Sequence, residues 1–472
     1  MIEKRVKQFS IVFLTYVVIA VAFFFIGGDQ IQYSMIKSNI QPVKGMFPEL
    51  SAGTVLEQSF YSSTDTLAQV SFMTGTYGRE NTGTLEVSLL DADTQQDYLR
   101  LSLPVKELPD NDMFLWEFDE PLLNVKHKHF VLRVESTCPA GQAPTIYYSD
   151  PETGVAPAWI NHEQTDIQFT FQFCGKAYSW FGQHYWILAV VLGGFLLIYM
   201  AVALWREKKG KYTFPIYIEG IWKKYGFLIR QLVVRDFKIK YKRSVLGYLW
   251  SFLNPLLTML VQYFIFSNLF KSDIENFPVY LLSGTILFSF FQDAVGQGLI
   301  SILANASLIT KVYMPKYIYP ITKVLSCSVN LLISFIPLLL VTVITGENIT
   351  PAILLLPFAM LCLLLFCAGL SMFLASAMVF FRDTQYLWGI ATLIWMYATP
   401  LFYPETIIPE QYRVVLKINP LYHIIKFVRT ILIDGVSPEP RRYFYCLISA
   451  VFACIIGGIV FKKSQDKFVL YI

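Results

Sequence analysis

Asp293 is the residue whose type and position most suggest chemistry, because it is the one acidic residue within the long apolar segments described below. A carboxylate inside a bilayer is costly, so it is a functional candidate by default, for example as one step of a proton relay. Asp293 lies near one end of its segment, however, where it can reach water or a neighbouring helix. A single carboxylate of this kind gives little support to proton-coupled transport.

Other reactive residue types are too scattered to predict a catalytic centre. The sequence contains no Gly-x-x-x-x-Gly-Lys-Ser/Thr phosphate loop, and no Ser/His/Asp set predicts a hydrolase. The histidines lack the spacing of metal ligands, and His127 and His129, two apart on a predicted strand, are expected to face solvent. The sequence therefore predicts no catalytic residue, no metal site and no cofactor held by this chain.

The composition excludes a soluble protein. Of 472 residues, 55% are hydrophobic and 15% are charged, whereas a soluble domain has about 45–50% and ~25%. The mean hydropathy of +0.48 agrees. Seven cysteines in so long a chain argue against a disulfide scaffold, and 16% aromatic residues argue against a disordered protein. We therefore predict an integral membrane protein.

Eight segments are apolar enough to cross a bilayer, which takes roughly 20 residues of helix. They are Phe9–Gly27, Tyr185–Leu204, Gly247–Phe270, Val279–Val295, Val324–Thr345, Ala352–Phe381, Leu387–Phe402 and Tyr443–Phe461. The first follows Lys4, Arg5 and Lys7, as a signal peptide would, but residues 26–30 lack a small-x-small cleavage site. We expect an uncleaved anchor there rather than a signal peptide.

Charged residues are segregated along the chain, and this predicts its orientation. Residues 205–246 hold twelve Lys/Arg against three acids, a net charge of +9. Residues 28–183 hold nine Lys/Arg against twenty acids, a net charge of −11. Because basic loops stay in the cytoplasm, we expect residues 205–246 and both termini inside, and residues 28–183 outside.

Residues 28–183 are expected to form an extracytoplasmic antiparallel β-sandwich. Apolar residues alternate with others in at least six short runs, which is the period of strands with one buried face. Examples are Leu85/Val87/Leu89, Phe130/Leu132/Val134 and Phe169/Phe171/Phe173. Cys138 and Cys174 are the two cysteines of this segment and are a possible disulfide.

The segment Ile218–Val234 has the pattern of a basic amphipathic helix. Its apolar residues, Trp222 among them, fall on one face, and Lys223, Lys224 and Arg230 fall on the other. A helix of this kind beside a span is expected in the headgroup plane, where it would bind membrane lipids. The alternative is a cytoplasmic helix that packs on protein.

Several short motifs follow one another in the second half of the chain. They are YKRSVLGYLWSFLNP at Tyr241–Pro255, NASLITKVYMPK at Asn305–Lys316, Phe381-Arg382-Asp383, then Pro400, Tyr403 and Ile408-Pro409, and finally Asn419-Pro420 with Arg429. Through their joint order and spacing, the chain from about Tyr225 to its end resembles the type-2 ABC exporter permeases of polysaccharide export. These are the membrane subunits that export lipid-linked O-antigen, capsule and teichoic acid.

The resemblance implies an α-helical membrane core of six helices within a protein of about eight spans. It also implies a homodimer that works with two copies of a separate ABC ATPase, which would hold the ATP and magnesium. The cytoplasmic loop after the second core helix would form a coupling helix that docks on the ATPase, with contacts at Leu308, Lys311, Tyr313, Pro315 and Lys316. The alternative for this segment is an ordinary connecting loop.

Residues 403–442 are placed outside, yet they carry a net charge of +2, contrary to the usual bias. The resemblance implies short re-entrant helices there that act as an outer gate. We expect Arg413, Lys426 and Arg429 to meet the diphosphate or acidic sugars of the exported lipid. The alternative is that these side chains reach out to lipid headgroups.

Aromatic residues crowd the core spans, and in related exporters aromatic rings line the conduit. The candidates are Tyr248, Trp250, Tyr263, Phe291, Trp395 and Tyr397. The alternative is that these rings pack between helices or lie at the membrane interface. The small residues Gly369 and Ser371 are expected to allow close helix approach.

These observations predict five regions. They are a membrane anchor at 1–27, a β-sandwich at 28–183, a return helix at 184–205, a basic cytoplasmic segment at 206–246 and a permease core at 247–472. The β-sandwich loosely resembles carbohydrate-binding jelly rolls in strand pattern alone, and would receive the glycan or dock an envelope partner.

The predicted function is therefore that of a transport subunit, not an enzyme, in a bacterial cytoplasmic membrane. It would export a lipid-linked glycan and would bind no nucleic acid. The alternatives are a lipid or drug exporter of the same superfamily, a membrane glycosyltransferase or polymerase, and a receptor with an external sensor.

Overall fold

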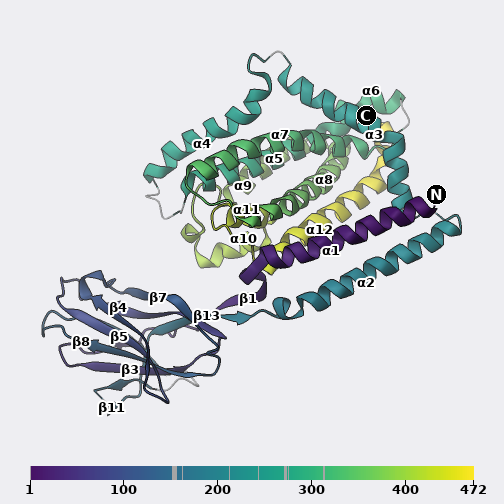
Figure 1. Ribbon diagram of the computed structural model, residues 1–472. Helices are drawn as coiled ribbons and strands as arrows, with labels where there is room; N and C mark the ends of the chain where they lie inside the picture. Colours follow the sequence, from purple (N-terminus) through teal and green to yellow (C-terminus); the bar gives the residue numbers. More distant parts are fainter. Residues whose placement is uncertain are drawn as a thin grey trace. The chain divides into compact units, whose positions relative to one another are not determined.

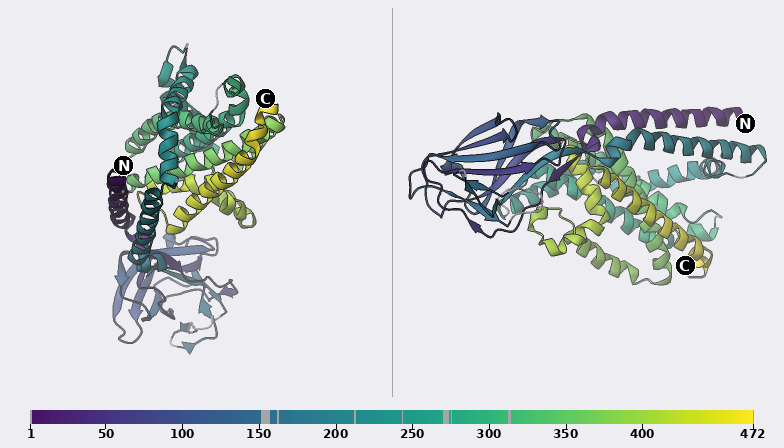
Figure 2. Two further views of the ribbon diagram at one scale, coloured as in Figure 1. Left: turned by 90° about the vertical axis from the view of Figure 1, so that its right-hand side faces the viewer. Right: turned by 90° about the horizontal axis from the view of Figure 1, so that it is seen from below.

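The computed structural model describes residues 2–150, 157–161, 163–211, 213–242, 244–269, 274, 276–311 and 314–471 (Figures 1 and 2). The chain divides into two compact units. The helical unit comprises Met1–Ile31 and Trp186–Ile472, and the β unit comprises Gln32–Tyr185.

The β unit consists of two antiparallel sheets. The seven-stranded sheet has the order β1-β13-β4-β9-β12, with β7 paired to β4 and β2 paired to β9, and the six-stranded sheet has the order β11-β10-β3-β8-β5-β6. The strands are β1 Tyr33–Lys37, β2 Gly45–Met46, β3 Val55–Tyr61, β4 Thr66–Gly75, β5 Thr84–Asp91, β6 Asp97–Pro104, β7 Asp112–Leu123, β8 His129–Ser136, β9 Thr145–Ser149, β10 Trp159–Ile160, β11 Glu163–Gln164, β12 Gln168–Phe169 and β13 Phe171–Tyr178. A single 3-10 turn, η1 Val105–Glu107, follows β6.

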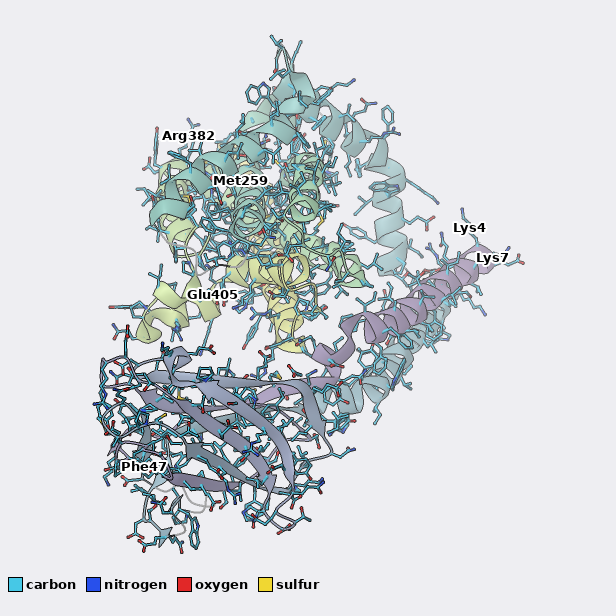
Figure 3. All side chains as sticks on the ribbon, turned by 60° about the vertical axis from the view of Figure 1, so that its left-hand side comes forward. Lys4, Lys7, Phe47, Met259, Arg382 and Glu405 are labelled. Atoms are coloured by element: carbon cyan, nitrogen blue, oxygen red, sulfur yellow. The ribbon has the colours of Figure 1, made fainter. Side chains whose placement is uncertain are left out.

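The alternating apolar residues of the sequence form one core shared by both sheets. On β5 and β8 the side chains that point between the sheets are almost completely buried. The side chains that alternate with them are mostly more exposed. Between the sheets, the ring of Phe60 on β3 stacks on that of Phe173 on β13, with centroids 4.9 Å apart. Phe47, labelled in Figure 3, belongs to the same core. The predicted antiparallel sandwich is confirmed.

The possible disulfide between Cys138 and Cys174 is wrong, because both cysteines are buried and free. Cys138 follows β8 and packs in the core of the unit beside Gly83. Cys174 lies on β13 next to Phe173, which faces the core. Because successive side chains of a strand point to opposite faces, the thiol of Cys174 points away from the core that holds Cys138.

The helical unit contains the long helices of the chain (Figure 1). They are α1 Ile2–Gln32, α2 Trp180–Lys208, α3 Phe214–Tyr241, α4 Trp250–Leu269, α5 Phe277–Ala304, α7 Ile318–Ile344, α8 Leu356–Phe380 and α12 Pro440–Ser464. Shorter helices are α6 Ala306–Lys311, α9 Thr384–Tyr397, α10 Arg413–Ile418, α11 Pro420–Leu432 and α13 Phe468–Tyr471. Short 3-10 turns are η2 Gly247–Leu249, η3 Pro351–Leu355, η4 Glu405–Ile407, η5 Glu410–Tyr412 and η6 Gln465–Lys467.

Seven helical runs in the described residues are long and apolar enough to cross a membrane, one fewer than the sequence predicted. The predicted span Leu387–Phe402 is the 14-residue helix α9. At about 1.5 Å per residue it is roughly 21 Å long, short of the ~30 Å hydrocarbon core. It ends at Tyr397 because Pro400 disfavours helix in the residue before it.

Other boundaries differ by several residues in the direction of longer helices. The fourth predicted span, Val279–Val295, is the 28-residue helix α5. The amphipathic helix predicted at Ile218–Val234 is the 28-residue helix α3. Apolar windows underestimate the C-terminal ends of both helices, because polar residues such as Lys238 and Gln297 continue the helical backbone hydrogen bonds there.

The core of the helical unit packs α5, α7, α8, α11 and α12 around one buried apolar cluster. A Cβ added to Gly369 would overlap the backbone of Ala453 on α12, and one added to Gly457 would overlap the backbone of Gly369. A Cβ on Gly298 of α5 would overlap the side chain of Ser371. The prediction that small residues allow close helix approach is confirmed for Gly369 and Ser371.

Candidate functional site

Three spans of the helical unit carry polar residues at intervals of three or four, so each span presents one polar stripe. Figure 1 shows these three helices side by side. The stripes are Ser251, Asn254 and Thr258 on α4, Thr285, Ser289, Asp293 and Gln297 on α5, and Lys323, Ser326, Asn330 and Ser334 on α7. All of them line one of two adjoining cavities.

The two cavities have volumes of about 320 Å³ and about 560 Å³. They share Lys240, Asp293, Cys327 and Asn330 in their linings. Along α5 the lining extends from Thr285 to Ala304, which at about 1.5 Å per residue is roughly 28 Å, close to the thickness of a bilayer core. We call this combined space the polar cavity.

Ion pairs attach the C-terminal half of α3 to the walls of the polar cavity. Lys240 Nζ lies 2.9 Å from Asp293 Oδ2 on α5, and Lys323 Nζ on α7 lies 2.7 Å from Asp236 Oδ2. Arg235 lies 2.9 Å from the other oxygen of Asp236. The Asp236 carboxylate is 8% exposed, whereas that of Asp293 is 52% exposed. The second pair is therefore buried, and the first opens to the cavity.

The charge of Lys240 is maintained by its partner. Burial lowers the pKa of Lys240, but the Asp293 carboxylate outweighs this effect, so the pKa lies above the ordinary value. Lys240 therefore carries its charge at neutral pH.

Hydrogen bonds between neutral groups complete the wall where α3, α4 and α7 meet. The hydroxyl of Tyr241 donates to Asn330 Oδ1 at 2.8 Å and also contacts Ser251 Oγ. Ser251 Oγ lies 3.1 Å from the same Asn330 oxygen, and Ser334 Oγ donates to the carbonyl of Ser251 at 3.1 Å. This wall presents hydroxyl and amide groups of the kind that hydrogen-bond sugars.

The polar cavity offers groups that can recognise a ligand by hydrogen bonds and charge. Among the described residues, no group of His, Cys, Asp and Glu could hold a metal ion. The cavity combines hydroxyls, amides and paired charges, and its aromatic lining residues are few. Such a lining suits a ligand that is strongly hydrated and rich in hydroxyl groups.

Sequence reasoning singled out Asp293 but missed the stripes to which it belongs. The sequence does contain a signal for them, because polar residues recur at every fourth position from Thr285 to Gln297 within a mostly apolar segment. Sequence reasoning also missed Lys240 as the partner of Asp293. The two residues are 53 positions apart, and local patterns do not reveal that α3 contacts α5 there.

The predicted coupling segment forms the short helix α6 and the loop after it. Leu308 packs against an apolar cluster and Lys311 is exposed. Lys316 Nζ donates to the carbonyl of Gln465 at 2.6 Å, and Pro315 lies one residue before it, half-buried. Tyr313 lies outside the described residues. The structure places these residues together without testing what they bind.

The amphipathic helix keeps the predicted residues at its surface. Trp222, Lys223, Lys224 and Arg230 are all exposed on α3. Leu232 of the same helix is buried against residues of α7 and α8. The N-terminal half of α3 therefore presents both an apolar and a basic surface, while its C-terminal half packs on the core.

The predicted outer segment contains two short helices, α10 and α11, and Arg429 on α11 has a different role from the one expected. Its guanidinium donates to the carbonyls of Pro400, Leu401 and Tyr280 at 2.8, 3.1 and 3.0 Å. It also lies over the ring of Tyr280, 3.3 Å from the centroid. At 6% exposure, Arg429 is turned into the core, so the prediction that it meets a phosphate is wrong for this structure.

The other two cations that were predicted to meet the exported lipid, Arg413 and Lys426, are closer to the surface. Lys426 Nζ lies 2.6 Å from Glu405 Oε2, and the hydroxyl of Tyr422 donates to the same oxygen at 2.9 Å. Figure 3 labels Glu405 in the segment before α10. Arg413 donates weakly to the carbonyl of Ile408 at 3.4 Å and is exposed. Lys426 and Arg413 are therefore more exposed than Arg429.

The predicted channel aromatics separate into two groups. Phe291 is fully buried and packs on the rings of Phe366, Trp388 and Trp395, so its assignment to a channel is wrong within this chain. Trp395 is half-buried and donates through Nε1 to Asn419 Oδ1 at 2.8 Å. Exposed positions are taken by Tyr248, Trp250, Tyr263 and Tyr397, of which Trp250 lines the polar cavity.

Comparison with known proteins covers the part of the chain that forms the polar cavity. Residues 228–433 match the family described as ABC-2 type transporter. The O-antigen export system permease protein RfbA of Klebsiella pneumoniae is 29% identical over 252 residues, which is 52% of this chain and 95% of that protein. RfbA of Myxococcus xanthus is 30% identical over 246 residues, with the same coverage.

A third relative is more distant. The polysialic acid transport protein KpsM of Escherichia coli is 24% identical over 246 residues, which is 50% of this chain and 93% of that protein. In all three comparisons about half of the present chain lies outside the match.

Proposed function

The chain belongs to the ABC-2 type transporter family, as a permease related to those of polysaccharide export, and from that premise we propose that it exports a lipid-linked cell-surface glycan. The observation that carries this proposal is the polar cavity along α5. A membrane protein that moved an apolar drug or lipid would have little use for stripes of hydroxyl, amide and charged groups across most of the bilayer.

The proposed cargo is a glycan on a polyprenyl diphosphate. Sugars would hydrogen-bond to the neutral wall around Asn330, and the diphosphate would be drawn to Arg235, Lys240 and Lys323, which line the larger of the two cavities. O-antigen and polysialic acid are the cargoes in the names of the relatives. A teichoic-acid-like polymer has the same two chemical parts.

We further propose that a separate ABC ATPase supplies the energy, with two copies serving a homodimer of this chain. The sequence contains no phosphate loop of its own. The helix α6 and the residues Leu308, Lys311, Pro315 and Lys316 form the proposed docking surface. ATP and magnesium would be held by that partner.

The proposed topology places α3, α6 and both termini in the cytoplasm of a bacterial inner or plasma membrane. The charges of +9 for residues 205–246 and −11 for residues 28–183 support it. The β unit would then lie outside, where we propose that it guides the emerging glycan or docks an envelope partner.

A cavity-filling substitution tests the proposal. Ser289→Trp places an indole in the polar cavity, whereas Ser328→Trp makes the same change on α7 at a position that does not line the cavity. We expect Ser289→Trp to reduce surface glycan at least tenfold and to cause lipid-linked glycan to accumulate inside, while an ABC ATPase still copurifies. The Ser328→Trp variant should retain export.

Two outcomes would contradict the proposal. One is unchanged export by a stable Ser289→Trp protein, because the cavity would then not be the path of the cargo. The other is loss of a lipid or drug efflux activity with normal surface glycan, because the cargo class would then be wrong.

A further inference from the structure

A groove lies between the helices that precede the family match. Residues of α1, α2 and the N-terminal half of α3 enclose about 830 Å³, within the range of ligand-binding pockets. Most of its lining is apolar, and several of the side chains are exposed. The lining includes Phe9, Ile11, Val12, Leu196, Met200 and Trp222.

A smaller crevice of about 240 Å³ adjoins the groove and is lined by charged residues. The two spaces share Arg5, Gln8 and Glu219, and the crevice adds Lys4 and Lys223. Gly220 also lines the crevice, and a Cβ on it would meet no atom within 4 Å, so there is room for a ligand. Together the spaces form an amphipathic site with one apolar and one cationic end.

Ion pairs among Arg5, Glu207 and Glu219, called the ionic triad below, connect the three helices at the cationic end. Arg5 on α1 lies 3.3 Å from Glu207 on α2 and 2.5 Å from Glu219 on α3, and the exposed fractions of the Arg5 and Glu207 side chains are 12% and 10%. Hydrogen bonds from Lys223 and Arg5 lower the pKa of Glu219, so its carboxylate stays charged at neutral pH. Arg5 is thus balanced by two carboxylates.

The remaining cations make the crevice attractive to an anion. With the triad included, Lys4, Arg5 and Lys223 outnumber Glu207 and Glu219 by one charge. Lys4 has no carboxylate within ion-pair distance among the described residues, and Lys223 is 70% exposed although it contacts Glu219 at 2.8 Å. Figure 3 shows Lys4 and Lys7 at the end of α1.

We propose that this site binds an anionic phospholipid of the bilayer, with an acyl chain in the groove and the phosphate at Lys4 and Lys223. Spans of a multi-pass protein face lipid chains, and the amphipathic helix α3 suits the headgroup level. The site is separate from the polar cavity, because Glu219 and Asp236 are 17 residues apart on α3, or roughly 25 Å.

Matched charge variants of the full-length protein test the headgroup contact. Lys4→Gln with Lys223→Gln removes two charges from the crevice, and Lys7→Gln with Lys224→Gln removes two charges from the same helices outside it. Thermal stability is compared in nanodiscs of phosphatidylcholine with and without phosphatidylglycerol. We expect the first pair to lose at least half of the stabilisation by phosphatidylglycerol and the second pair to retain it.

Quenching of Trp222 tests the chain contact. Phosphatidylglycerol brominated on its acyl chain should quench a fluorescence component that Trp222→Phe removes, and phosphatidylcholine brominated in the same way should quench it at least threefold less. Equal loss in both charge pairs, or equal quenching by both lipids, would overturn the proposal. Neither measurement requires ATP or a glycan, so its failure leaves the proposed function standing.

Discussion

The polar cavity and the Arg429 cluster, which consists of Arg429, Tyr280 and the carbonyls of Pro400 and Leu401, both contain charged side chains within the helical unit. The two regions stabilise these charges in different ways. In the cavity, Lys240 and Asp293 are partly open to solvent and balance each other at 2.9 Å. In the outer cluster, Arg429 is buried and is balanced by three backbone carbonyls and the ring of Tyr280.

This difference distinguishes a possible binding site, the polar cavity, from a structural contact, the Arg429 cluster. A charge paired across a cavity can exchange its partner for a ligand, because water and the ligand reach it. A buried guanidinium whose two terminal nitrogens donate to backbone carbonyls joins three chain segments and is out of reach of a ligand. Arg429 therefore positions α11, the segment after α9, and α5, whereas Lys240 is exposed to the polar cavity.

The largest effect is expected from Arg429→Met. It removes three hydrogen bonds made by a charged donor, and each bond of this kind is worth about 1.5–3 kcal/mol. The carbonyls of Pro400 and Tyr280 keep the hydroxyls of Tyr280 and Ser283 as donors. We expect a marked fall in melting temperature and in membrane abundance, with loss of export. Arg429→Lys should recover less than half of the stability, because an ammonium group cannot match the planar donors or the stacking. A stable Arg429→Met protein would mean that the cluster is not a structural contact.

A smaller effect is expected from Lys323→Met. It leaves the Asp236 carboxylate, which is 8% exposed, with Arg235 as its remaining partner. Breaking a buried pair costs about 3–5 kcal/mol when no partner remains, so we expect less than this. The melting temperature of purified protein measures the change, and Asp236→Asn in the same background should restore part of it.

Asp293→Asn should change stability little and export more. Its pair with Lys240 is partly exposed, and such pairs contribute about 0.2–1 kcal/mol. A double-mutant cycle with Lys240→Gln should therefore give a coupling energy below about 1 kcal/mol, while surface glycan falls severalfold. A coupling energy of about 3–5 kcal/mol, as for a buried pair, would mean that Lys240 and Asp293 are as structural as the Arg429 cluster.

The smallest effect concerns pH. Because the folded-state pKa of Lys240 is raised above its ordinary 10.5, the pair contributes its full stability below that value and loses it as pH rises through the folded-state pKa. The difference in melting temperature between wild type and Asp293→Asn should therefore be constant from pH 6 to pH 9. A difference that changes within this range would show that another group controls the pair.

Local patterns of the sequence predicted the elements well. Alternation identified strands such as β5 and β8, apolar length identified seven spans, and the spacing of Gly369 and Ser371 indicated close packing. These features depend on neighbours a few positions away along the chain. Two predictions were wrong: that α9 spans the membrane and that Arg429 meets a phosphate. The surroundings of such a short helix and of a single cation are set by segments that are distant in the sequence.

By itself, therefore, the sequence determined a membrane protein with a β-sandwich inserted between spans, because hydrophobic period and length are local properties of the chain. Tertiary structure alone decided that three polar stripes meet in one cavity, that Lys240 opposes Asp293 and that Arg429 faces inward. The physical reason is that burial and ion pairing depend on which helix faces are in contact. Those contacts join residues up to 149 positions apart, as between Arg429 and Tyr280.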